Sequence, residues 1–357
     1  MKDHLETRGS KESLVENLSI NITGRDHKMA EKHHSMRSIH FWKCYWITLR
    51  PYLFFISGIA GCLGIVNHPA VPVYKFVLGI ITFFLTYGFG QALTDVFQTD
   101  TDSLSSPYRP LVRGLITKNQ VLMVSLLALT CCVAIFTYLN PWLLIAGVIG
   151  VIGLILYTFF KRRWWGGPFW NAWIVALLTL MGKMIGEPRF LNFPDLFDNM
   201  LVLSMGSIFF SYAIFVLSGY LKDVSADKTT GYKTIPVRFG WNTALVISIL
   251  LTIITFLFSF LILNKNNIFL LNSISELLIL LVWIGSLFTF GFAYFQLYSI
   301  NKEERLAFKG IANIVRGFLV IHLAEIFSFN QALIVFGIGY YLFFEVVLFF
   351  RPEKSQV

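Results

Sequence analysis

The sequence predicts an all-α membrane protein, a polytopic helical bundle of about nine transmembrane helices. Hydrophobic residues make up 56% of the 357 residues and charged residues only 14%. The mean hydropathy is +0.66, which lies far outside the range of soluble domains. Apolar segments of about 20 residues recur along the chain, and a helix of this length crosses a ~30 Å hydrocarbon core.

Composition divides the chain into three regions. Residues 1–42 are polar and are predicted to form a disordered cytoplasmic tail, residues 43–351 to form the membrane domain, and residues 352–357 to form a short tail. Within the membrane domain we expect spans at residues 50–67, 73–97, 119–139, 141–160, 168–187, 199–220, 242–263, 276–299 and 330–350.

One further apolar segment, residues 308–328, contains Arg316, His322 and Glu325. Ionisable groups inside a membrane usually face a functional cavity or one another. A tilted helix at the membrane surface also tolerates them. The segment is therefore either a tenth span with a polar interior or a surface helix.

Lysine and arginine concentrate in the loops after the second, fourth, sixth and eighth predicted spans. The alternate loops hold little beyond Lys75, Arg189 and Lys265. Because cation-rich loops are cytoplasmic, these four loops and the N-terminus are predicted to face the cytoplasm, in an integral protein of the plasma membrane. Topology also explains the net charge of +9, so we expect no nucleic-acid partner, and the sequence indicates no protein partner.

Two acidic clusters lie where predicted spans end on this cytoplasmic side. Their candidate metal ligands are Gln91, Asp95, Asp100, Asp102, Asp223 and Asp227. Such oxygen ligands suit Mg²⁺, which takes one or two carboxylates and completes its shell with water and substrate phosphate. Aspartate also caps helix ends, but two clusters on one side, each followed by lysine or arginine, favour binding of a diphosphate through metal ions.

The spacing within each cluster supports shared ligation. If the second span stays helical through Asp95, this residue shares a helix face with Gln91, four residues earlier. Asp223 and Asp227 have the same spacing at the end of the sixth span. Each pair would aim two oxygen atoms at one point.

Longer motifs around both clusters resemble the UbiA superfamily of intramembrane prenyltransferases. The stretch DSLSSPYRPLVRG at residues 102–114 resembles the loop that follows the family's first aspartate-rich motif, and DVSADKTTGYKTIPVRFG at residues 223–240 resembles its second motif. The sequences LRP at residues 49–51 and YTFFKR at residues 157–162 are also similar to the family pattern. The similarity extends from about residue 45 to residue 350.

The resemblance implies a helical bundle around a central cavity, in which two Mg²⁺ ions hold an isoprenyl diphosphate with its tail among the helices and the membrane lipids. It assigns catalysis to Asp95, Asp102, Asp223 and Asp227. It implies diphosphate contacts from Arg109, Lys161, Lys222, Lys228, Lys233 and Tyr157. Metals and cations would stabilise the departing pyrophosphate, and the allylic cation left behind would meet a nucleophile.

The chain also departs from the family pattern. The usual first motif is Asn-x-x-x-Asp-x-x-x-Asp, and counting back from Asp102 places Thr94 and Gln98 at its other two positions. A register that starts at Gln91 and Asp95, with three extra residues before Asp102, keeps an amide and two carboxylates, and we favour it. In the second motif, an aspartate often found four residues before Asp223 is Gly219.

Three functions follow from the resemblance. The first is prenyl transfer to an aromatic or other lipid-pathway acceptor, which the sequence does not identify. The second is a UbiA-type terpene cyclase, which needs no acceptor, and the third is a non-catalytic lipid-binding protein. In the fifth span, Asn171 or Lys183 would touch an acceptor, unless Lys183 pairs with Glu187 one helical turn later.

Overall fold

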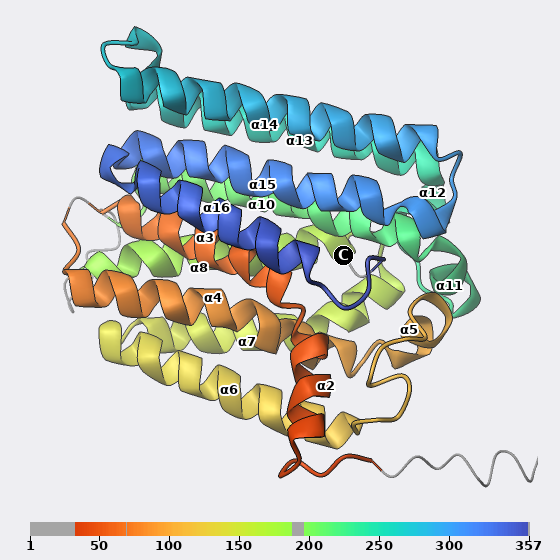
Figure 1. The fold of residues 1–357 in the computed structure, drawn as a ribbon. Coiled ribbons are helices and arrows are strands. Elements are labelled where there is room, and N and C mark those ends of the chain that lie inside the picture. Colours follow the sequence, from red (N-terminus) through yellow and green to blue (C-terminus); the bar gives the residue numbers. More distant parts are fainter. Residues whose placement is uncertain (1–32, 69, 188–195, 356–357) are drawn as a thin grey trace, which may run out of the picture.

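The computed structural model describes residues 33–68, 70–187 and 196–355, and in these ranges the regular structure is entirely helical. Long helices lie side by side in a bundle, and the short helices α5, α11 and α12 gather at one end of it (Figure 1). The long helices are α3 (Phe54–Val66), α4 (Val73–Asp95), α6 (Lys118–Leu139), α7 (Leu143–Arg163), α8 (Gly167–Gly186), α10 (Asn199–Gly219), α13 (Trp241–Lys265), α14 (Ile274–Ser299), α15 (Phe308–Phe329) and α16 (Ile334–Phe349). The short ones are α2 (Ile39–Leu49), α5 (Thr99–Ser105), α11 (Val224–Thr229) and α12 (Ile235–Phe239).

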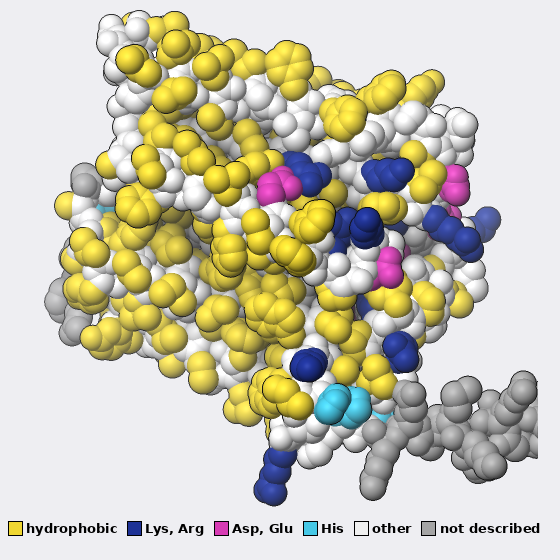
Figure 2. Space-filling model, in the orientation of Figure 1, with side chains coloured by type: hydrophobic (Ala, Val, Ile, Leu, Met, Phe, Trp, Pro, Cys, Tyr) yellow, Lys and Arg dark blue, Asp and Glu magenta, His cyan; other side chains and the backbone are white. Residues whose placement is uncertain are grey.

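The predicted membrane bundle is confirmed, with one span more than the nine expected. Within the described ranges, ten helical segments are long and apolar enough to cross a membrane. Figure 2 shows hydrophobic side chains over most of one face, with lysine and arginine gathered towards the end that carries α5 and α11. The chain is therefore an integral membrane protein with one distinctly charged end.

The first predicted span, residues 50–67, corresponds to the turn at Pro51–Leu53 and to α3, and a separate helix precedes it. Helix α2 already starts at Ile39, where the Ser38 side chain accepts a hydrogen bond from the His40 amide, so the tail boundary at residue 42 falls inside a helix. Arg50 then adopts a left-handed backbone conformation with φ 52° ahead of Pro51, which breaks the helix. In Figure 1, α2 consequently crosses the end of the bundle at a steep angle to α3.

Segment 308–328 is an interior helix of the bundle, and the surface-helix alternative is wrong. Helix α15 packs against α14, α3 and α10. His322 and Glu325 are fully buried, with 2.7 Å between His322 Nδ1 and Glu325 Oε2. Ser207 of α10 donates to Glu325 Oε1 at 2.6 Å, so the buried polar groups satisfy one another.

Small residues let α3 and α8 approach closely. A Cβ atom added at Gly64 would come within 1.9 Å of the Thr179 carbonyl oxygen, and one at Gly182 within 2.2 Å of the Gly61 carbonyl oxygen. Close backbone approach through small residues is typical of membrane helix packing. It brings α3 and α8 together beside the cavity described below.

Lys183 pairs with Asp198 and not with Glu187 as predicted. The buried Lys183 ammonium group contacts the Asp198 carboxylate at the start of α10. The reason is local, because α8 ends at Gly186 and Glu187 has an extended backbone conformation. This ion pair lies at the opposite end of α10 from Asp223, so Lys183 takes no part in the site at the charged end.

Candidate active site

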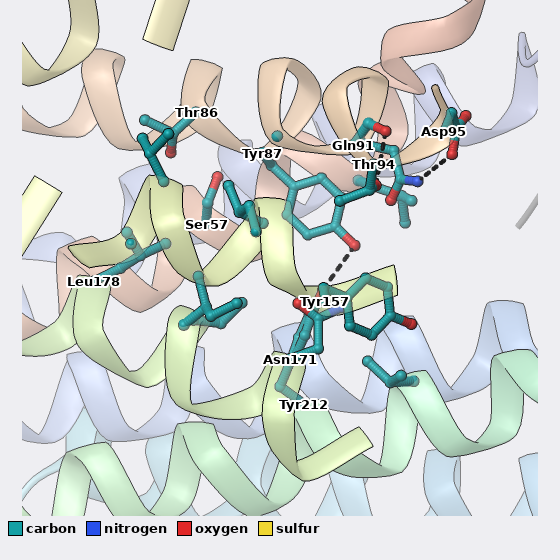
Figure 3. A pocket seen from close by; sticks show the side chains of 18 of the residues that line it. Ser57, Thr86, Tyr87, Gln91, Thr94, Asp95, Tyr157, Asn171, Leu178 and Tyr212 are labelled. Carbon is teal, nitrogen blue, oxygen red and sulfur yellow. Dashed lines mark hydrogen bonds between the residues drawn. The ribbon is translucent and has the colours of Figure 1, made fainter. Parts of the chain in front are cut away.

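A cavity runs into the bundle from the charged end. Its mouth is polar and is lined by Arg50, Gln91, Asp95, Gln98, Asp102, Arg109, Lys161, Lys222 and Asp223. Further in, the lining is largely apolar and comes mainly from α6, α7 and α8. Figure 3 shows Gln91, Thr94 and Asp95 along α4, the hydroxyl groups of Tyr87 and Tyr212 facing each other at 3.1 Å, and Leu178 on the inner side.

In the first acidic cluster, Gln91 and Asp95 share a helix face, as their spacing predicts. Helix α4 continues through Asp95, and the Gln91 side-chain amide donates to Asp95 Oδ1 at 2.8 Å. The chain then turns into α5, which carries Asp102 to the same cavity mouth. Thr94 also lines the cavity, but its hydroxyl donates to the Gln91 carbonyl oxygen of its own helix.

Arginines compensate both carboxylates of this cluster. One Nη atom of Arg50 lies 2.9 and 2.7 Å from the two Asp95 oxygens. Arg109 forms an ion pair with Asp102 and lies 3.8 Å from Asp95. All four side chains are buried or nearly so, so this half of the site is already close to charge balance.

The second acidic cluster does not continue a single helix, contrary to the prediction. Helix α10 ends at Gly219, and Asp223 instead precedes the new helix α11. The Asp227 amide still donates to the Asp223 carbonyl oxygen at 2.7 Å, so one helical turn joins the two residues. Asp223 lines the cavity, whereas Asp227 is fully buried behind Lys161.

Lys161 joins the two clusters. Its ammonium group donates to Gln98 Oε1 at 3.1 Å and lies 3.6 Å from Asp227 Oδ1. A second link runs between α5 and α11, where the Thr101 and Thr230 hydroxyl groups are 3.0 Å apart. Segments more than 100 residues apart in sequence thus form one polar layer over the cavity.

Burial shifts the acid–base properties of this layer. Burial raises the pKa of Asp227 to about 6, although Lys161 lowers it. Burial likewise raises the pKa of Asp102, against the opposing effect of Arg109. Burial alone would lower the pKa of Arg109, but Asp102 and Asp95 raise it above its ordinary value. Burial thus disfavours the charged form of these carboxylates, and a neighbouring cation offsets this effect.

The second cluster fits a divalent cation. The Oδ1 atoms of Asp223 and Asp227 are buried and accept no hydrogen bond, although Asp227 Oδ1 lies within 3.6 Å of the Lys161 ammonium group. Buried carboxylate oxygens are costly unless a cation or donor completes them. Among the described residues, no three His, Cys, Asp or Glu side chains cluster tightly enough to hold a metal by themselves. A bound Mg²⁺ would thus need additional oxygen ligands, which a diphosphate supplies.

Gly219 leaves space beside this cluster. A Cβ atom at Gly219 would have no neighbour within 4 Å, and the residue lines the cavity. The position at which the family pattern often has an aspartate is therefore an open part of the cavity wall, with room for water or substrate oxygen.

Besides the buried Asp227, three predicted site residues lie outside the cavity lining. Asp100 is exposed at the surface and is held by Arg162 at 2.5 Å and by the Tyr232 hydroxyl at 3.2 Å. Lys228 and Lys233 are exposed and do not line the cavity. Short helix α11 and the turn after it direct these residues away, so they contribute charge to the surface and not to the cavity.

The other residues predicted to contact the diphosphate do line the cavity. Arg109, Lys161, Lys222 and Tyr157 all line it, and the Tyr157 and Tyr220 hydroxyl groups are 2.9 Å apart. Asn171 also lines it.

Sequence analysis missed two residues of the site. Arg50 compensates Asp95, and Gln98 positions Lys161. A signal existed for Arg50, since an arginine directly before a proline at the start of a span matched the family pattern. Gln98 was a candidate ligand only in the register counted back from Asp102. The chain turns between α4 and α5, and this turn brings the residues of both registers to the cavity mouth.

Substitution of Gln91 and Thr94 tests the register. We expect Gln91→Ala to lower turnover about tenfold. Asp95 loses a hydrogen bond whose free energy is about 1.5 kcal/mol, which corresponds to about tenfold in rate. Thr94→Val should change turnover less than about threefold, since the lost hydroxyl bonds only its own helix backbone. Steady-state rates measured at saturating Mg²⁺ decide this. A larger loss in Thr94→Val than in Gln91→Ala contradicts the favoured register.

Comparison with known proteins identifies similar sequences. Residues 54–315 match the UbiA prenyltransferase family. The digeranylgeranylglyceryl phosphate synthase of Thermococcus kodakarensis is 26% identical over 219 residues, which cover 59% of this chain and 74% of the relative. The digeranylgeranylglyceryl phosphate synthase of Methanosphaera stadtmanae is 25% identical over 258 residues, which cover 72% of this chain and 89% of the relative.

Solved structures share the fold. A UbiA homologue from Aeropyrum pernix superimposes with a TM-score of 0.58 at 15% identity, covering 80% of this chain and 97% of the homologue. A UbiA homologue from Archaeoglobus fulgidus bound to DMAPP and Mg²⁺ superimposes with a TM-score of 0.52 at 20% identity, covering 78% and 98%. These likenesses confirm the predicted helical fold.

Proposed function

Because the chain belongs to the UbiA prenyltransferase family, we propose that it ionises an isoprenyl diphosphate with Mg²⁺ and transfers the prenyl group to a lipid-pathway acceptor within the membrane. One observation carries the proposal. The buried Asp223 Oδ1 atom accepts no hydrogen bond at the mouth of a cavity with a largely apolar interior, and Asp227 lies behind it, paired with Lys161.

The polar mouth would hold the diphosphate. Asp223, with Asp227 behind it, would bind Mg²⁺ together with phosphate oxygens, and bound Mg²⁺ would stabilise negative charge on the leaving pyrophosphate. Arg109, Lys161 and Lys222 line the mouth and would donate to the remaining phosphate oxygens. Asp100, Lys228 and Lys233 have no part in this proposal.

The carboxylates of the first cluster have a different role in this scheme. Asp95 holds Arg50, and Asp102 holds Arg109, so these aspartates orient cations at the mouth. They remain available as Mg²⁺ ligands if the diphosphate displaces the arginines. Gln91 adds an amide oxygen on the same helix face as Asp95.

The inner cavity would take the prenyl chain. Its walls include Leu129, Val133, Leu177 and Met181, which exclude water from the allylic cation that forms when the carbon–oxygen bond breaks. The rings of Tyr87 and Tyr212 lie beside this space and offer π faces to a cation. The acceptor nucleophile then forms the new bond to the allylic carbon and releases a proton.

The names of the relatives favour one class of acceptor. Relatives at 25–26% identity are digeranylgeranylglyceryl phosphate synthases, so we favour a prenylated glyceryl phosphate over an aromatic acceptor. The cation-rich loops predict that the site opens to the cytoplasm from the plasma membrane.

Product analysis tests the proposal. Purified protein is incubated with Mg²⁺ and geranylgeranyl diphosphate, together with a geranylgeranylated glyceryl phosphate, with an aromatic acceptor or without an acceptor, and products are read by mass spectrometry. We expect prenyl transfer and pyrophosphate release only with the glyceryl phosphate. A cyclic hydrocarbon formed without an acceptor would instead establish the terpene cyclase. If no mixture gives turnover, including mixtures with shorter or longer isoprenyl diphosphates, the remaining hypothesis is a non-catalytic lipid-binding protein.

A further inference from the structure

A second pocket lies between loops at the charged end, beside the cavity described above. It has a volume of about 830 Å³ and lies between the turn after α5, the start of α11 and the connection from α14 to α15. Lys222 lines both this pocket and the cavity mouth. We call it the loop pocket, and it is large enough for the polar head of a small ligand.

Two of the cations that line the loop pocket are unpaired within the part of the chain that the structure describes. Lys302 and Arg305 line it, are exposed, and form no ion pair with any residue that the structure describes. The nearby Glu304 carboxylate is already occupied, because the Ser225 amide donates to its two oxygens at 3.0 Å each and the Ser225 hydroxyl at 2.5 Å. The exposed Glu303 is the other acid in the lining.

The same contact ties the loop pocket to the second acidic cluster. Ser225 lies two residues after Asp223, at the start of α11, so Glu304 anchors the α14–α15 connection to that helix. Just before it, Asn301 and Lys302 adopt left-handed backbone conformations with φ 48° and 66°. Two such non-glycine residues in succession are strained, and they place Lys302 beside the pocket.

The wall formed by the turn after α5 offers further donors. Ser105 and Tyr108 line the loop pocket, and their hydroxyl groups are buried and have no hydrogen-bond partner in the described part of the chain. Unpartnered buried hydroxyl groups next to cations suit the oxygens of a phosphate group. Ser105 at the end of α5, Tyr108 in the turn after it, and Lys302 and Arg305 in the α14–α15 connection thus line one space.

We propose that the loop pocket is a second anion site, which binds a phosphate group exchanged with the catalytic cavity past Lys222. This inference rests on the proposed function. The phosphate has two sources in such a reaction. One is the head group of a glyceryl phosphate acceptor, and the other is the departing pyrophosphate on its way to water.

Direct binding gives the first test. Inorganic phosphate and pyrophosphate are titrated calorimetrically into the purified full-length protein without Mg²⁺, which removes the metal-dependent part of binding in the cavity. We expect the double substitution Lys302→Ala and Arg305→Ala to weaken binding at least about tenfold, as expected for loss of charge-assisted hydrogen bonds. Arg238→Ala with Lys309→Ala removes the same charges from exposed positions that line neither pocket, and this control should bind as the wild type does.

Kinetics then separates the two sources. If the acceptor head group occupies the loop pocket, the double substitution raises KM for a glyceryl phosphate acceptor while KM for the donor stays unchanged. If pyrophosphate leaves through it, the substitution weakens product inhibition by pyrophosphate and leaves acceptor KM unchanged. Phosphate binding equal in wild type, variant and control overturns the proposal. The calorimetric result does not depend on turnover of an acceptor. Failure of the proposed function can therefore be distinguished from failure of the anion-site proposal.

Discussion

Asp223→Asn is expected to lower turnover by at least about a hundredfold while the protein still inserts and folds. The substitution keeps the size of the side chain but removes the charge of the unpaired oxygen that lines the cavity. Stabilisation of leaving-group charge by a bound metal is worth several kcal/mol, and each 1.4 kcal/mol is about tenfold in rate. Turnover and the Mg²⁺ concentration for half-maximal rate are both measured, and the latter should rise.

Asp100→Asn is the matched control for this substitution. Asp100 belongs to the same charged end but pairs with Arg162 at the surface, so its loss should change turnover less than about threefold, in line with the small contribution of exposed ion pairs. Equal losses in Asp223→Asn and Asp100→Asn would point to a general charge effect and would rule out the assignment of Asp223 as a metal ligand.

The sequence predicted the features that depend on local pattern. The length of the apolar segments and the cation-rich loops were sufficient to predict the helical bundle, because few structures other than helices can cross a lipid bilayer. The i to i+4 spacing of Gln91 and Asp95 was sufficient for their mutual contact, because it lies within one helix. Both clusters were expected at one end, and they lie there.

Features that depend on tertiary contacts were not predictable. Segment 308–328 remained undecided because the partners of its charges, Ser207 and Glu345, lie on other helices. Lys183 could be matched only to a neighbour in sequence, whereas its partner is Asp198. The exposure of Lys228 and Lys233 follows from the break between Gly219 and Asp223, after which the chain begins the separate helix α11.

Arg50→Ala is expected to destabilise the protein by about 3 kcal/mol and to reduce turnover strongly. Arg50 and Asp95 are both buried, and removal of one partner leaves the other charge without compensation, which typically costs about 3–5 kcal/mol. Arg109, at 3.8 Å from Asp95, and Gln91 offset part of this loss. The midpoint of thermal unfolding in detergent measures the change.

The double substitution Arg50→Ala with Asp95→Ala separates stability from catalysis. If Arg50 serves chiefly to compensate Asp95, the double variant should be more stable than Arg50→Ala alone, because no buried charge then remains unpaired. Its turnover should not recover, since the mouth has lost both a cation and a carboxylate. An additive loss of stability in the double variant contradicts the pairing, and recovery of turnover contradicts a role for either residue in holding the diphosphate.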